Sequence, residues 1–305
     1  MTARFARPLT LVATGVAIAL ALGACAGGAA AAGPKNPNGD QQDVKIGVHT
    51  GWDEGIAASY LWQAILKDEG YKVTMETADP GVVYTGLAGG DTDVNFDMWL
   101  PMTHADYLKK YGKHMEQLGA WYSDARLTVA VNADSPLKSL DDLAKHPGVV
   151  DNRIVGIEPG AGLTRIMKDD VIPNYGLDKM DFIESSTPAM LAELKGAMSK
   201  HKNIAVTLWR PHWAYEAYKL RDLLDPKGSL GKAEHIETVG RTDFGKDYPL
   251  FASWLKKFKL TNAQLFSLEN LMFNENGGKD NEASAKKWLA DNPTFVTDLK
   301  AAAKK

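Results

Sequence analysis

The stretch VKIGVHTGWDEGIAASYLWQAIL, residues 44–66, decides the fold class. It begins with the short strand-like run Val44–Val48 and continues into a segment in which apolar residues recur at spacings of three and four, as in a helix. Tyr71–Met75 and Asp93–Phe96 repeat the strand pattern, with a short predicted helix at Tyr84–Gly89 between them. Strands that alternate with helices predict an α/β fold with a mainly parallel sheet.

A second set of the same kind follows further along the chain. Ile154–Ile157 and Ile204–Leu208 are predicted strands, Leu163–Val171 and Leu191–Met198 are predicted helices, and the tail from Phe244 is almost wholly helical in pattern. Two α/β sets in one chain predict two lobes with a ligand cleft between them.

The lobe boundaries follow from two short strand-like stretches between the sets. Leu127–Val131 and Ile236–Gly240 are interpreted as the two crossings of the chain between the lobes. The first lobe is then expected to comprise residues 44–128 plus 239–305, and the second lobe residues 129–238.

Composition narrows the classes of function. A hydrophobic fraction of 45% and a charged fraction of 24% are ordinary for a globular protein and argue against disorder. A net charge of −3 does not favour nucleic acid as a partner. The sequence lacks His-Glu-x-x-His, Gly-x-Ser-x-Gly, P-loop and Gly-x-Gly-x-x-Gly motifs, so nothing indicates an enzyme, a bound metal or a cofactor.

The N-terminal residues have the pattern of an export signal. Arg4 and Arg7 precede the uncharged run 9–22, which is short for a membrane-spanning helix and typical of a signal peptide. The run ends in Leu22-Gly23-Ala24-Cys25, the pattern at which bacterial lipoproteins are cleaved and lipidated, and Cys25 is the only cysteine. We expect a signal peptide over 1–24, a lipid on Cys25 that anchors an extracytoplasmic protein to the membrane, and a flexible tether over 25–43. The alternative is an ordinary secretory signal with a chance cysteine.

Three of the eight tryptophans stand at the ends of predicted strands. Trp52, Trp99 and Trp209 each follow a strand and precede a helix. Ligands of open α/β sheets bind outside the carboxyl ends of strands, so these three indoles are expected to face one place. The alternative is that each indole packs between a strand and a helix. The other five are interpreted as packing residues: Trp62, Trp121, Trp213, Trp254 and Trp288.

A site built of several indoles suits one class of ligand. A quaternary ammonium has no N–H group to donate and a large, weakly hydrated positive surface, and an indole face attracts it by about 0.5–2 kcal/mol. Such a cage discriminates against small hydrated cations such as sodium.

Two further features suit an anion. Residues 156–163 read as a strand, a glycine-rich turn and a helix start, where free backbone N–H groups hold anions without a basic side chain. His104 follows Trp99 by five residues near the start of a predicted helix and is a candidate hydrogen-bond donor to a carboxylate. The alternatives are a plain turn and a surface or capping histidine.

Four motifs in order carry a family resemblance, which covers essentially all of residues 44–305. Together they resemble the glycine-betaine-binding proteins of osmoprotectant ABC importers. The motifs are Gly51-Trp52-Asp53-Glu54, Trp99-Leu100-Pro101 with His104, Gly156-Ile157-Glu158-Pro159-Gly160-Ala161-Gly162, and Trp209-Arg210-Pro211-His212-Trp213.

The resemblance implies a two-lobed, type II-like periplasmic-binding-protein fold that closes on a zwitterion. Trp52, Trp99 and Trp209 would enclose the trimethylammonium group. Gly162 and Leu163 would give backbone N–H groups to the carboxylate, and His104 a side-chain hydrogen bond. The resemblance also implies a monomer that catalyses nothing, has no cofactor, and delivers its ligand to a membrane permease and its ATPase.

Three further polar residues are candidates for the site. Asp97 departs from relatives that have a small residue there; inside the cleft it would favour choline or a longer cation, and otherwise it is solvent-facing or capping. Arg210 faces outward or partners Asp97 or the ligand carboxylate. His212 is a candidate through its place in the fourth motif.

Other ligands and other classes of protein remain as alternatives. Choline, carnitine and dimethylsulfoniopropionate present a similar cationic head. An extracytoplasmic enzyme acting on quaternary amines, and a permease-associated sensor or adhesin, are the alternatives of a different class.

Overall fold

The computed structural model describes residues 35–304. The predicted signal peptide, Cys25 and the first part of the predicted tether lie outside the described residues. Within residues 35–304, no helix combines the length and the apolar character that crossing a membrane requires.

In the part of the chain that the structure describes, nine strands form one mixed sheet in the order β2-β1-β3-β9-β4-β7-β5-β6, with β8 paired to β4. β1 is parallel to β2 and β3, and β5 is parallel to β6 and β7. β9 and β4 run antiparallel to each other and to their other neighbours. The prediction of a mainly parallel sheet was therefore wrong at the centre of the sheet, because β4 and β9 carry the chain directly between its two halves instead of returning through a helix.

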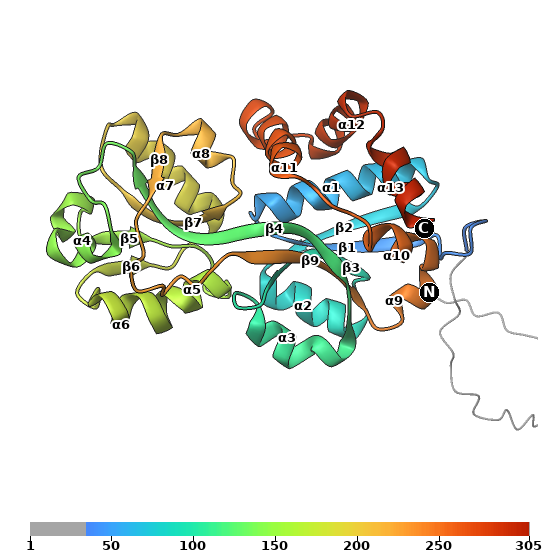
Figure 1. The fold of residues 1–305 in the computed structure, drawn as a ribbon, viewed down its shortest axis with the longest axis horizontal. Coiled ribbons are helices and arrows are strands. Elements are labelled where there is room, and N and C mark those ends of the chain that lie inside the picture. Colours follow the sequence, from blue (N-terminus) through green and yellow to red (C-terminus); the bar gives the residue numbers. More distant parts are fainter. Residues whose placement is uncertain (1–34, 305) are drawn as a thin grey trace, which may run out of the picture. The chain divides into compact units, whose positions relative to one another are not determined.

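We call the half of the molecule around β1, β2, β3 and β9 the first lobe. α1 lies on one face of this half-sheet beside α11 and α12, and α2 lies on the other face (Figure 1). The elements of this lobe are β1 (Asp43–His49), α1 (Asp53–Asp68), β2 (Lys72–Ala78), α2 (Pro80–Gly89), β3 (Val94–Leu100), α3 (Ala105–Tyr111), η1 (Gly112–His114), β9 (Glu234–Arg241), α9 (Phe244–Asp247), α10 (Pro249–Leu255), α11 (Asn262–Glu269), η4 (Asn270–Glu275), α12 (Asn281–Asp291) and α13 (Phe295–Ala303).

The second lobe surrounds β5, β6, β7 and β8. Its helices are short, with six residues or fewer in each except α7. Its elements are α4 (Leu140–Lys145), η2 (Pro147–Val150), β5 (Arg153–Val155), α5 (Gly162–Ile166), η3 (Met167–Val171), α6 (Ile172–Tyr175), β6 (Asp181–Ile183), α7 (Thr187–Ser199), β7 (Ala205–Arg210), α8 (Ala214–Ala217) and β8 (Leu220–Asp222).

β4 (Met115–Asn132) belongs to both lobes (Figure 1). Its residues pair with β9 as far as Ala125 and with β7 from Arg126 onward. The change of partner lies just before the predicted crossing at 127–131, and β9 begins two residues before the predicted return crossing at 236–240. The lobe boundaries themselves stay a prediction.

Helix α1 shows how the pattern of apolar residues positions the site. Leu61, Trp62 and Ile65 are 0–2% exposed and pack the helix against the core. Burying each such side chain contributes about 1.5–3 kcal/mol, which fixes the helix on the sheet. The first turn of α1 is thereby held at the end of β1, next to the second lobe.

The end of the predicted tether is part of the folded body. Asp40 is fully buried, and its carboxylate accepts hydrogen bonds from Tyr71 Oη at 2.6 Å and from the backbone N–H groups of Leu250 and Phe251 at 2.8 and 2.9 Å. These last two N–H groups open α10 and have no acceptor within their own helix. The interpretation of residues up to 43 as a free tether was wrong at this end, because Asp40 satisfies a helix terminus.

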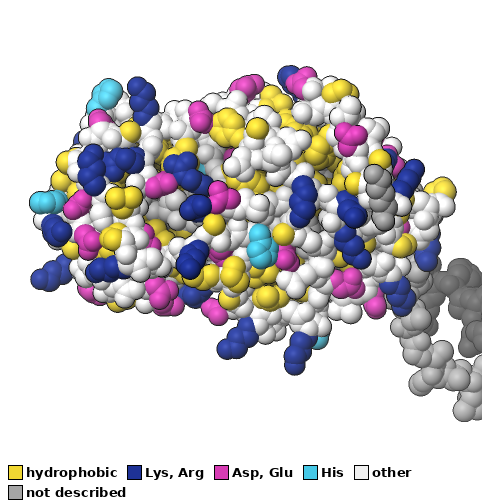
Figure 2. All heavy atoms as spheres, in the orientation of Figure 1, with side chains coloured by type: hydrophobic (Ala, Val, Ile, Leu, Met, Phe, Trp, Pro, Cys, Tyr) yellow, Lys and Arg dark blue, Asp and Glu magenta, His cyan; other side chains and the backbone are white. Residues whose placement is uncertain are grey.

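The surface carries both signs of charge. On the face shown in Figure 2, acidic and basic side chains are interspersed over both lobes. This distribution is that of an ordinary solvated surface and gives this face no basic stripe for nucleic acid.

Candidate ligand site

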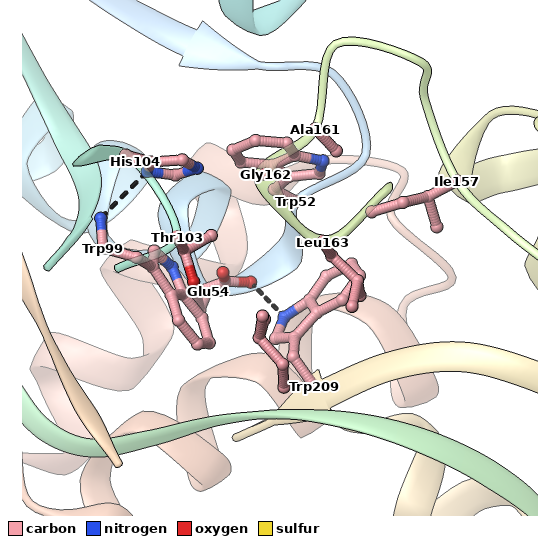
Figure 3. A pocket seen from close by; sticks show the side chains of 11 residues that line it. Trp52, Glu54, Trp99, Thr103, His104, Ile157, Ala161, Gly162, Leu163 and Trp209 are labelled. Atoms are coloured by element: carbon pink, nitrogen blue, oxygen red, sulfur yellow. Dashed lines mark hydrogen bonds between the residues drawn. The ribbon is translucent and has the colours of Figure 1, made fainter. Parts of the chain in front are cut away.

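A small cavity lies where the two lobes meet. The first lobe contributes the start of α1, the end of β3 and the turn after it; the second contributes the loop before α5 and the end of β7, and β4 closes one side. The lining residues are Trp52, Glu54, Trp99, Thr103, His104, Leu127, Ile157, Ala161, Gly162, Leu163 and Trp209 (Figure 3).

The three predicted indoles all line this cavity. Trp52 immediately precedes α1, whereas Trp99 and Trp209 are the second-last residues of β3 and β7. The last two were expected after their strands and lie within them instead, but still at the carboxyl ends. We call these three side chains, which are 3–5% exposed, the cage indoles.

Each cage indole is held by a buried carboxylate through its ring N–H. These hydrogen bonds fix the ring planes through the edge of each indole, without using the faces that line the cavity. They run from Trp52 Nε1 to Glu158 Oε2 at 3.2 Å, from Trp99 Nε1 to Asp97 Oδ1 at 2.9 Å, and from Trp209 Nε1 to Glu54 Oε2 at 2.8 Å.

Four buried carboxyl groups gather behind the cage, and we call them the acid cluster: Asp53, Glu54, Asp97 and Glu269. Burial raises the pKa of all four, to about 7 for Asp53 and Asp97, and the neighbouring carboxylates raise the pKa of Glu54 and of Glu269 further.

No Lys or Arg in the described residues forms an ion pair with the acid cluster. His212 approaches the cluster, with its Nε2 3.8 Å from Asp53 Oδ2, but burial lowers the pKa of His212 to about 3, so it is neutral. Residues 35–304 contain no group of three or more His, Cys, Asp or Glu side chains arranged to hold a metal ion. The cluster therefore favours a cation brought by a ligand.

Asp97→Asn is expected to stabilise the protein more at pH 8 than at pH 5. Burial raises the pKa of Asp97 in the folded protein to about 7 from its usual value of 3.8, so the folded protein keeps a proton that the unfolded chain has lost. The contribution of Asp97 to stability is fully present below pH 3.8 and is lost as pH rises through 7. The melting temperature of the variant minus that of the parent should increase by about 5 °C between the two pH values.

The measurement is thermal unfolding of the ligand-free protein, with the exposed Asp178→Asn as matched control. If the melting temperature of the variant minus that of the parent stays constant between pH 5 and pH 8, Asp97 is already ionised at pH 5.

His104 lies between two cage indoles. Its ring stacks on Trp52 with centroids 5.4 Å apart and planes 6° apart, and its Nδ1 accepts the backbone N–H of Trp99 at 2.9 Å. Burial, and then the charge of Arg165, lowers the pKa of His104 to about 3, so the ring is neutral. Because Nδ1 is an acceptor, the ring proton lies on Nε2, and His104 is a neutral hydrogen-bond donor at the cavity wall.

Gly162 and Leu163 bring backbone N–H groups to the opposite wall. They open α5, where the first N–H groups have no acceptor in the helix. A Cβ on Gly162 would collide with the carbonyl oxygen of Thr103 in the first lobe. The absence of a side chain at 162 is thus what lets the two lobes touch at the cavity.

Asp97, the departure noted in the sequence, is buried at 1% exposure and supports a cage indole. The interpretation as a solvent-facing or capping residue was wrong. Its Oδ2 lies against the Cα of Gly55, where a side chain would collide with it, so the carboxyl group is wedged between β3 and α1.

Arg210 and His212 do not line the cavity. Arg210 Nε lies 2.7 Å from Asp222 Oδ2, and its guanidinium covers the ring of Tyr215 at 3.6 Å, so it partners neither Asp97 nor the cavity. His212 is buried behind Trp209, and its Nδ1 accepts the N–H of Ala214. The candidacy of both as ligand contacts is corrected, because Arg210 is held against Asp222 and His212 lies behind Trp209, outside the cavity lining.

Sequence reasoning missed the carboxylates that hold the indoles. Glu54 and Glu158 stood in quoted motifs, yet an acid in the first turn of a helix is ordinarily explained by the helix dipole. Their partners lie 155 and 106 residues away in the chain, so only the assembled lobes show the contacts. The signal available was an excess of acids beside the tryptophans, in Trp52-Asp53-Glu54 and Asp97-Met98-Trp99.

Fold and site together define a two-lobed binding protein whose cavity between the lobes is lined by three indoles. Residues 42–291 match the model of the family described as the substrate binding domain of ABC-type glycine betaine transport system, and the chain belongs to this family. The resemblance stated from the four motifs is confirmed at this level.

Individual relatives agree with the family. The chain is 34% identical over 164 residues to a glycine betaine/carnitine transport binding protein, GbuC, of Listeria monocytogenes serotype 1/2a (strain 10403S), a match that covers 53% of this chain and 52% of the relative. The matched region thus spans about half the length of that curated relative.

Solved structures resemble the chain over more of its length. Lactococcal OpuAC in its closed-liganded conformation with glycine betaine has a TM-score of 0.77 at 30% identity and covers 85% of this chain and 99% of its own. An ABC-transporter choline binding protein in complex with choline has a TM-score of 0.75 at 26% identity and covers 86% and 97%. These structures confirm the expected two-lobed periplasmic-binding-protein architecture.

Proposed function

We propose that this chain is the extracytoplasmic substrate-binding protein of an ABC importer and that its ligand is a quaternary ammonium compound, with glycine betaine first. The observation that carries the proposal is the cavity with three indole faces, backed by an acid cluster that has no basic counter-ion among residues 35–304. The relatives named above bind glycine betaine, carnitine or choline, which supports this class of ligand.

The cationic end of the ligand fits the indole side of the cavity. Each indole face contributes about 0.5–2 kcal/mol to binding of a desolvated cation, and the acid cluster adds attraction that little intervening water screens. For sodium and potassium the free energy of dehydration exceeds the free energy of interaction with this cavity, because the indole faces offer no oxygen atoms to coordinate the ion. The site therefore selects a large cation with apolar substituents.

The anionic end fits the hydrogen-bond donors that the two lobes bring to the cavity. The N–H groups of Gly162 and Leu163 and the Nε2–H of His104 are uncharged donors, and they suit a carboxylate without attracting free anions strongly. A compound with a trimethylammonium group at one end and a carboxylate at the other satisfies both walls of a cavity this small.

Calorimetric titration of the purified protein with a ligand panel tests the proposal. The panel is glycine betaine, choline, carnitine, dimethylsulfoniopropionate and 3,3-dimethylbutanoate, the last being the carbon isostere of glycine betaine without its positive charge. We expect glycine betaine to bind with a micromolar Kd. The Kd of the isostere should be higher by a factor of about 30 or more, because the isostere has no positive charge and loses the cation–π attraction. Flat titrations with all cations would contradict the proposal, and turnover of any of them would indicate an enzyme.

His104→Ala is expected to weaken glycine betaine more than choline. The variant loses one donor to the carboxylate, a group that choline lacks, so Kd should rise about tenfold for glycine betaine and about threefold or less for choline. The same titrations measure both ligands. Equal losses for the two would assign His104 a purely structural role in stacking on Trp52.

The chain's export and anchoring are part of the proposal. A signal peptide over 1–24 and a lipid on Cys25 would place a monomeric binding protein at the outer face of the membrane, beside the permease and ATPase that receive the ligand, without nucleic acid or cofactor. Labelling of producing cells with a fatty-acid probe tests this, with Cys25→Ser as control; equal label in both proteins would exclude the anchor.

A further inference from the structure

Three tryptophan N–H groups donate hydrogen bonds across the interface between the lobes. Two belong to the cage indoles and one lies outside the cavity. They are Trp52 to Glu158 and Trp209 to Glu54, given above, and Trp213 Nε1 to Asp53 Oδ2. By contrast, the bond from Trp99 to Asp97 stays within the first lobe.

The two lobes present complementary sets of groups. The first lobe offers three consecutive residues at the start of α1, namely the donor Trp52 followed by the acceptors Asp53 and Glu54. The second lobe offers the acceptor Glu158 and the donors Trp209 and Trp213, so each indole meets a carboxylate of the other lobe (Figure 3 shows the pair of Glu54 and Trp209).

The acceptors are held in place within their own lobes. Glu158 accepts the backbone N–H of Thr187 at 2.7 Å and its hydroxyl at 2.9 Å, at the start of α7. Asp53 and Glu54 are 7% and 2% exposed on a helix that is fixed by its apolar face. A carboxylate positioned in this way meets its indole in only one relative orientation of the lobes.

Closure of the lobes in any other relative orientation leaves these donors and acceptors without partners and is therefore unfavourable. Separated lobes expose the indole N–H groups and carboxylates to water, whereas contact between the lobes removes that water. A buried donor or acceptor left without its partner costs about 1–3 kcal/mol, more for a charged one. The three pairs therefore penalise a partly or wrongly closed cleft and favour the closure that forms the cage.

We propose that Asp53, Glu54 and Glu158 are positioning residues of a closure latch, in which indole–carboxylate hydrogen bonds between the lobes lock the cage around the ligand. The latch depends on the proposed function in one respect: binding of a ligand drives the closure of the lobes. The pair Trp213–Asp53 lies outside the cavity, so it acts on the lobes without touching the ligand.

Stopped-flow and calorimetric binding of glycine betaine to Trp213→Phe, Asp53→Ala and the double variant test the latch. Each single variant should raise Kd about three- to tenfold, and the double variant no more than the larger single effect, because both remove the same bond. The loss should appear in the dissociation rate, since the latch holds the closed lobes together around a bound ligand. Asp53→Asn keeps an oxygen acceptor and should recover most of the affinity.

Trp288→Phe is the matched control. Its indole is buried and donates to Ser267 within the first lobe, so the substitution removes the same N–H without affecting the interface. We expect its Kd to stay within twofold of the parent. Single variants that also stay within twofold, or losses that add fully in the double variant, would overturn the latch.

The latch and the proposed function fail separately. If the parent binds no quaternary amine, the proposed function is wrong, and the latch is then judged by small-angle X-ray scattering of the ligand-free proteins. Trp213→Phe and Asp53→Ala should have a larger radius of gyration than the parent, and Trp288→Phe the same one. Superimposable curves for all four proteins would overturn it.

Discussion

Gly162→Ala is expected to raise the Kd for glycine betaine about a hundredfold while the protein stays folded. The added Cβ would collide with the backbone carbonyl of Thr103, which belongs to the other lobe. Neither backbone yields easily, because Gly162 opens α5 and Thr103 is tied to Glu234 through its N–H and its hydroxyl. The collision is relieved when the lobes move apart, so the substitution opposes closure instead of folding.

Calorimetry and thermal unfolding separate the two outcomes. The backbone N–H of residue 162 survives in the variant, so the loss reports closure and not the removed donor. Gly196→Ala is the matched control, because nothing lies within 4 Å of the position its Cβ would occupy in α7. A Gly162→Ala protein with parental affinity would show that ligand binds without the lobe contact seen here.

Trp99→Ala is expected to raise Kd by about ten- to a hundredfold. The variant loses one face of the cage and frees Asp97 Oδ1, so it forfeits a cation–π contact worth about 0.5–2 kcal/mol together with the exclusion of water around it. Titration with glycine betaine measures the loss. Circular dichroism controls for folding, since the indole is only 3% exposed.

Trp99→Phe separates the contribution of the aromatic face from that of the hydrogen bond to Asp97. A phenyl ring keeps an aromatic face but has no N–H for Asp97, so its Kd should lie between those of the parent and of Trp99→Ala. An unchanged Kd in Trp99→Ala would remove this residue from the site, and equal losses in both variants would assign the effect to the bond with Asp97.

The positions of the indoles were predictable because they depend on local sequence. A tryptophan at the carboxyl end of a strand is aimed at the sheet edge where α/β proteins bind ligands, and this holds whether it is the second-last residue of the strand, as for Trp99 and Trp209, or lies in the turn after it, as for Trp52. The alternation of strands and helices in 44–100 likewise encodes its own α/β arrangement.

The partners of these indoles were not predictable, because they come from elsewhere in the chain. Nothing near Trp213 in the sequence indicates that its N–H meets Asp53, 160 residues away. The antiparallel centre of the sheet has the same origin, since β9 pairs with β3 and β4 after an excursion through the whole second lobe. The place of Arg210 was left open between the surface, Asp97 and the ligand, because its partner Asp222 lies twelve residues further on in a strand that the sequence did not indicate.

The long strand β4 has a mechanical consequence. One uninterrupted strand enters both lobes, so the lobes are not joined by a free linker and their relative motion is confined mainly to bending and twisting of β4 and the segment beside it. The pairing of β4 with β9 slips at three places between Gln117 and Ala125, where the ladder is most compliant. Because an open cleft joined in this way samples few orientations, closing it forfeits little orientational entropy, and more of the attraction of the cage is retained as affinity.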